Sequence, residues 1–148
     1  MSPEFFTPHM ILFLAGVVAV IAAVVAIAMA RDSVGSAVIA AALSAGFAGL
    51  TAVTIWSEGL WLVIENHTLN LWGIQVWYDL LLAIGVALFF VLPRARAAGM
   101  NVLPWTLLVV LTASIGLLAM VARLFWLERA SSSSAAALAA AGPASAAA

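Results

Sequence analysis

The feature that most constrains this chain is an uninterrupted apolar run from Met10 to Ala30. At ~1.5 Å per residue, a helix of that length crosses the ~30 Å hydrocarbon core of a bilayer. A cleaved secretory signal peptide is the competing interpretation, but the residues before the run include Glu4 and no Lys or Arg. The run therefore predicts a first membrane span over residues 10–30.

Three further apolar runs predict spans over residues 36–56, 73–92 and 105–127. Pro93 is expected to end the third span and Pro104 to begin the fourth, because proline lacks an N–H and fits only the first turn of a helix well. The runs are continuously apolar rather than alternating, which favours helices over barrel strands. We predict an all-α, membrane-spanning bundle of about four transmembrane helices in residues 1–129. An Ala/Ser-rich low-complexity tail, poor in large apolar side chains, follows over residues 130–148.

Composition narrows the function mainly by exclusion. Only 7% of the residues are charged, against about 25% in a soluble domain, and the five basic residues are all arginines without a continuous basic face. Nucleic-acid binding is therefore not expected. Because the chain has no Cys and only two His, we predict no metal site and no cofactor from this chain alone, with a bound lipid or isoprenoid as the remaining class of ligand. The expected partners are the lipid bilayer and either further copies of the chain or a larger membrane complex.

Arginine placement predicts the orientation. With four crossings, Arg31, Arg94 and Arg96 lie on one side of the membrane, and Arg123 and Arg129 lie on the other. Positively charged loops remain on the cytoplasmic side. The side with three arginines is therefore expected to be cytoplasmic. This favours a protein of the bacterial cytoplasmic (inner) membrane with its N- and C-termini outside.

Polar and small residues form a stripe at helical spacing on three of the predicted spans. These stripes are expected to face the interior of the bundle, because a charge that faces lipid costs about 2.5–3.5 kcal/mol near the centre of a helix. The stripe residues are Ser44, Ala48, Thr51 and Glu58 on the second span, Trp72, Gln75 and Asp79 on the third, and Thr112, Gly116, Ala119 and Arg123 on the fourth.

The depths of the charged residues suggest two arrangements. If the fourth span runs antiparallel to the third, Asp79 and Arg123 lie at similar depth and form a structural ion pair. The alternative is a polar pocket at the outer face that leaves Glu58 free beside an apolar cavity of a few hundred Å³. Its predicted lining residues are Gln75, Trp61, Trp72, Glu65 and His67.

The third and fourth spans also resemble a family of small bacterial multi-pass membrane proteins known as a domain of unknown function. The residues that carry the resemblance are Trp77, Asp79, Arg94, Arg96, Gly99, Met100, Trp105 and Arg129, over about 60 residues. That family is distantly similar to membrane-integral terpene cyclases, which have about seven spans and protonate a polyprenyl epoxide with intramembrane carboxyls. The resemblance implies catalytic roles for Asp79 and Glu58, within a cavity that a chain of four spans would complete only by oligomerising.

Three functions are compatible with these sequence features. The first is a non-catalytic subunit or scaffold of a membrane complex, favoured because the sequence has no aqueous domain and no nucleotide-binding loop. The second is an acid-catalysed, terpene cyclase-like isoprenoid enzyme, which needs a carboxyl kept protonated by apolar surroundings. The third is a small proton-coupled transporter, for which a carboxylate near the midplane of the membrane is the expected feature.

Overall fold

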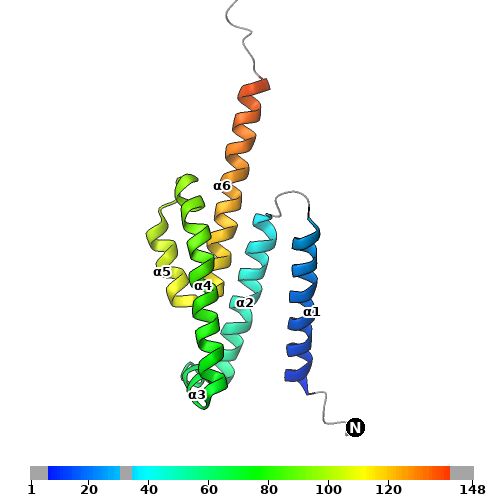
Figure 1. The fold of residues 1–148 in the computed structure, drawn as a ribbon, viewed down its shortest axis with the longest axis vertical. Coiled ribbons are helices and arrows are strands. Elements are labelled where there is room, and N and C mark those ends of the chain that lie inside the picture. Colours follow the sequence, from blue (N-terminus) through cyan, green and yellow to red (C-terminus); the bar gives the residue numbers. More distant parts are fainter. Residues whose placement is uncertain (1–6, 31–34, 141–148) are drawn as a thin grey trace, which may run out of the picture. The chain divides into compact units, whose positions relative to one another are not determined.

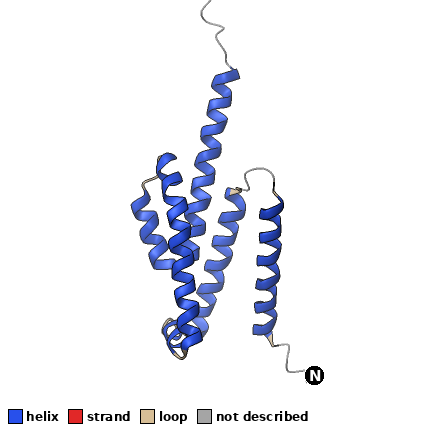
Figure 2. Ribbon diagram, viewed as in Figure 1, coloured by secondary structure: helices blue, strands red, loops and turns tan. Residues whose placement is uncertain are grey.

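The computed structural model describes residues 7–30 and 35–140. Within them the chain forms six helices, and it contains no strand there (Figures 1 and 2). The helices are α1 (Pro8–Met29), α2 (Ala37–Glu58), α3 (Leu62–Thr68), α4 (Leu71–Ala97), α5 (Val102–Thr112) and α6 (Ser114–Ala140). Helices α1, α2 and α4 are long and apolar enough to cross a membrane, which confirms the predicted all-helical membrane fold.

Helix α1 belongs to a first unit that ends at Gly35, and the other five helices form a second unit from Ser36 onward. The start of α1 is fixed by Thr7, whose hydroxyl accepts a hydrogen bond from the backbone N–H of Met10 at 3.2 Å, and by Pro8 in the first turn. Within this unit none of its residues is buried, so the helix is held there by its own backbone hydrogen bonds.

Helix α4 continues past Pro93, so the prediction that Pro93 ends the third span is wrong. Proline removes only its own hydrogen bond from the ladder, and contacts beyond it keep the helix intact, since Ala95 is fully buried. The helix ends instead at Ala97, and Gly99 beyond its cap has φ 74°. There the N–H of Gly99 donates to the carbonyl of Arg96, and the N–H of Met100 donates to that of Ala95, as in a Schellman motif.

The prediction of one continuous helix over residues 105–127 is also wrong, because the chain reverses at Ala113. This residue has φ 51° and ψ −119°, and it separates α5 from α6, which pack side by side (Figure 1). At 11 residues, α5 is about 16 Å long and too short to cross a bilayer. A Cβ on Gly116 would lie 2.7 Å from the carbonyl oxygen of Leu108, so the two helices approach too closely for any larger residue.

The core of the second unit lies where α4, α5 and α6 meet. Its buried side chains are Ala95, Met100, Val109, Met120 and Leu124. Helix α2 packs along α6 through the face that carries Ala40 and Ser44, which are both buried, and the hydroxyl of Ser44 donates to the carbonyl of Ile115 at 2.9 Å. The predicted polar stripe of α2 therefore faces its neighbour over its first half, whereas Glu58 at its end is exposed.

The Ala/Ser-rich tail is helical as far as Ala140, because α6 runs on without a break beyond the predicted end of the fourth span. Four consecutive serines, residues 131–134, each donate a hydroxyl hydrogen bond to the carbonyl four residues earlier. Their side chains are exposed. This part of α6 is held by local hydrogen bonds instead of packing, and residues 141–148 lie outside the described range.

Candidate functional site

A cavity of about 340 Å³ lies between α2 and α3, and Glu58 and His67 are both on its wall. Glu58 is the last residue of α2, and Gly59, with φ 85°, turns the chain toward the short helix α3. The α2 side of the cavity follows one helix face from Phe47 to Glu58, at the spacing that places residues on a common face. The cavity is therefore apolar along most of its length and polar at the end where α2 stops.

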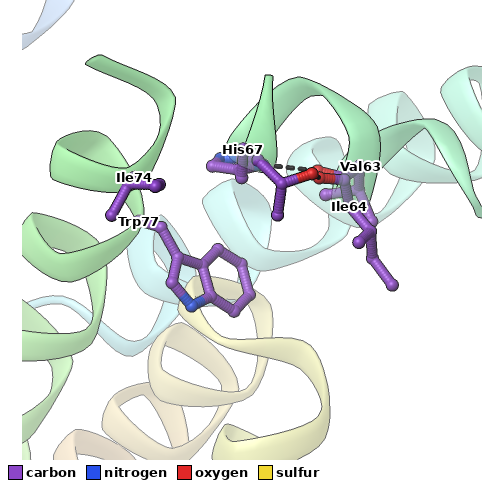
Figure 3. A pocket seen from close by; sticks show the side chains of 6 residues that line it. Val63, Ile64, His67, Ile74 and Trp77 are labelled. Carbon is purple, nitrogen blue, oxygen red and sulfur yellow. Dashed lines mark hydrogen bonds between the residues drawn. The ribbon is translucent and has the colours of Figure 1, made fainter. Parts of the chain in front are cut away.

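His67 is held in place by contacts to both α3 and α4. Its Nδ1 lies 2.6 Å from the carbonyl oxygen of Val63, and its ring meets that of Trp77 edge-on, with 5.1 Å between centroids (Figure 3). A carbonyl can only accept, so Nδ1 carries the hydrogen, and in the neutral imidazole Nε2 keeps its lone pair. The fixed ring thus presents a hydrogen-bond acceptor at Nε2.

Glycine at position 73 makes this arrangement sterically feasible. A Cβ there would lie 2.5 Å from the carbonyl oxygen of Asn66 and 3.1 Å from the backbone of His67. Helix α3 can therefore lie directly against the first turn of α4. A second cavity, of about 240 Å³, opens between them and is lined by Val63, Ile64, His67, Thr68, Ile74 and Trp77 (Figure 3).

The polar stripe of α4 faces outward, contrary to the expectation that it faces the bundle. Trp72, Gln75 and Asp79 are all exposed, and they line a surface depression of about 320 Å³ together with Val76, Tyr78 and Leu82. This depression shares no residue with the cavity that contains Glu58. The two carboxyls that a cyclase-like site would need thus line separate surfaces.

The structure does not bring Asp79 and Arg123 together. The Arg123 guanidinium lies 4.3 Å from the centre of the Trp126 ring, and an ion pair joins Arg94 to Glu128, with Nη2 and Oε2 2.9 Å apart. Because Arg94 sits near the end of α4, this bidentate pair places Glu128 at that end of the unit. The predicted Asp79–Arg123 pair required residues 105–127 to form one helix antiparallel to α4. The turn at Ala113 divides that segment into α5 and α6.

The other predicted pocket residues do not line the cavity that contains Glu58. Trp61 is the residue before α3 and is exposed, and Glu65 in the first turn of α3 is exposed as well. The cavity takes its remaining polar side chains from residues that were not predicted for it, above all Asn66 and Thr51. Asn66 could have been predicted as a cavity residue from its position next to His67, in the short helix that follows Glu58.

No group of three potential metal ligands gathers within residues 7–30 and 35–140. A comparison of the chain with models of known families, with curated proteins and with solved structures finds no match. The site must therefore be interpreted from its own geometry. That geometry consists of an apolar cavity with acceptors at one end and, separately, a polar outward face on α4.

Proposed function

We propose that this protein is a non-catalytic subunit of a membrane complex, formed either by several copies of the chain or with a larger partner. The observation that carries this proposal is the outward face of α4. Gln75 and Asp79 are exposed on a helix that is long and apolar enough to span the membrane. A carboxylate that faces lipid costs about 2.5–3.5 kcal/mol at a helix centre and less toward the helix ends, whereas a neighbouring polar helix satisfies it.

Helix α1 supports the same proposal. Its small residues Ala15, Ala19 and Ala23 recur at four-residue spacing, which places them on one side of the helix. Small residues in that spacing allow two membrane helices to approach closely.

The distribution of charge supports an orientation with the C-terminal half of α6 in the cytoplasm. Arg94, Arg96 and Arg129 lie at the end of the second unit marked by the Arg94–Glu128 pair, and the sequence has no Arg or Lys from residue 32 to residue 93. Because positive residues mark the cytoplasmic side, we assign the end with these arginines to it. This reverses the predicted position of the C-terminus, which assumed a fourth crossing, and retains the cytoplasmic assignment of the turn after Arg94.

The two alternative functions have less support. A cyclase-like enzyme needs Glu58 and Asp79 around one substrate, and they line different surfaces. A proton-coupled transporter is expected to carry a carboxylate near the midplane. Asp79 is the ninth residue of the 27-residue helix α4, about 12 Å from its beginning and well short of its middle.

The proposal is tested by the native mass of the protein, purified from membranes in a mild detergent. The wild-type chain is expected in a complex with other chains, and Asp79→Leu is expected to shift at least half of it to a smaller species. Glu65→Leu, which removes an exposed carboxylate away from the α4 face, is the matched control and should preserve the complex. If Asp79 instead faces lipid, Asp79→Leu leaves the mass unchanged and raises thermal stability, and the proposal fails.

A further inference from the structure

The cavity between α2 and α3 has the dimensions and polarity of a site for an amphiphile. Its volume of about 340 Å³ falls in the range of small-molecule sites. The α2 wall, from Phe47 to Glu58, extends for about 16 Å along the helix. Leu50 and Ile55 on this wall are half exposed, so an apolar chain can lie against them with its other side in the surrounding bilayer.

The polar end of the cavity offers mainly hydrogen-bond acceptors. Glu58 contributes a carboxylate that has neither an ion pair nor a hydrogen bond within the described part of the chain. His67 adds the Nε2 lone pair, because its Nδ1–H is already bound to the carbonyl of Val63. Asn66 supplies an amide, whose NH2 group can donate to an oxygen.

The charge at this end of the molecule selects among headgroups. Neither Arg nor Lys occurs between residues 32 and 93, and Glu65 on α3 adds a second carboxylate to that of Glu58 on α2. A purely anionic headgroup would meet carboxylates without a compensating cation. A primary ammonium can donate to Glu58 and to Nε2 of His67 in charge-assisted hydrogen bonds, whereas a trimethylammonium group has no N–H to donate.

We infer that this cavity binds a bilayer phospholipid with a primary ammonium headgroup, as in ethanolamine lipids. The ammonium lies between Glu58 and His67, the amide of Asn66 donates to the phosphate, and one acyl chain follows the face of α2 toward Phe47. The inference is independent of the subunit proposal, because the cavity is formed within one chain.

The test is native mass spectrometry of the full-length protein in a nonionic detergent, with equal amounts of ethanolamine, choline and glycerol phospholipids of identical acyl chains. The wild-type chain is expected to retain the ethanolamine lipid about tenfold better than the choline lipid, at one lipid per chain. Glu58→Gln keeps the shape and removes the charge, and should lower this ratio to about one. Glu65→Gln removes a carboxylate that does not line the cavity and should retain the wild-type ratio.

Thermal unfolding of each variant separates loss of binding from loss of the fold. Equal retention of the three lipids by the wild type, or preference for the glycerol lipid, would overturn the inference. So would an unchanged ratio in Glu58→Gln, or an equal loss in both variants. If Glu58→Gln releases a protein chain instead of a lipid, the cavity is a protein interface and the inference fails, although the subunit proposal then gains support.

Discussion

The close approach of α5 and α6 makes Gly116→Ala the most informative single substitution. A Cβ at this position would lie 2.7 Å from the carbonyl oxygen of Leu108 and 2.8 Å from its carbonyl carbon. Ordinary van der Waals contact begins at about 3.4 Å, so the backbone of α5 would have to move by about 0.7 Å. Backbone cannot rotate away as a flexible side chain can. Helix α5 must therefore separate from α6, and the buried side chains between them lose contact.

The magnitude follows from this geometry. Overpacking of this kind costs about 1–3 kcal/mol, and alanine regains up to about 1 kcal/mol of helix propensity. We expect Gly116→Ala to lower the free energy of unfolding by up to about 2 kcal/mol. Gly85→Ala is the matched control, because Gly85 lies within α4 with nothing within 4 Å of its Cβ position. That change should raise the free energy of unfolding by about 0.5–1 kcal/mol.

Unfolding by SDS in mixed micelles, followed through the fluorescence of the six tryptophans, measures both variants. The two possible forms of this segment predict opposite signs. In a continuous helix over residues 105–127, alanine at position 116 would stabilise the protein as it does at position 85. A stabilising Gly116→Ala would therefore refute the turn at Ala113 and the hairpin of α5 and α6.

Three further results are expected. Gly73→Ala should push α3 away from α4, because the new Cβ would lie 2.5 Å from a backbone oxygen. Hydrogen exchange in α3 should become faster, and unchanged exchange would contradict the packing of α3 against α4. Arg94 and Glu128 are 55% and 37% exposed, so a double-mutant cycle should give a coupling of at most about 1 kcal/mol, and a value of about 3 kcal/mol would show that the pair is buried. Single cysteines at Ala98 and Ser133 should react with an impermeant thiol reagent from the same side of the membrane, whereas opposite sides would restore a fourth crossing.

The sequence was sufficient to locate the three long membrane helices, because a long apolar run has few alternatives to a span. It did not reveal the break at Ala113, since neighbouring Thr112 and Ser114 carry none of the Gly or Pro signals that usually mark a turn. The backbone of Ala113, with φ 51° and ψ −119°, lies in a sparsely populated region that costs about 1–3 kcal/mol and persists here through tertiary packing. Local pattern alone cannot report such packing.

The candidate site was predictable only in part, for the same reason. Glu58 and His67 were expected at one end of the molecule, and the structure places both on one cavity. Predicting whether Asp79 and Arg123 pair requires the direction of α6 relative to α4. That direction depends on the turn at Ala113, which was not predicted. Spacing along α4 correctly placed Gln75 and Asp79 on one face, but spacing cannot say whether a face is covered by the same chain or by another one.

The central claim, that the Gln75 and Asp79 face of α4 contacts another protein chain, is tested most directly by site-specific cross-linking. The chain has no cysteine, so Gln75→Cys and Leu81→Cys each provide a unique site for a photoreactive maleimide in native membranes. Leu81 is the control, because it is exposed on a different face of α4 and does not line the depression around Asp79. We predict protein cross-links from position 75 and mainly lipid adducts from position 81. Lipid adducts alone from position 75 would contradict the claim.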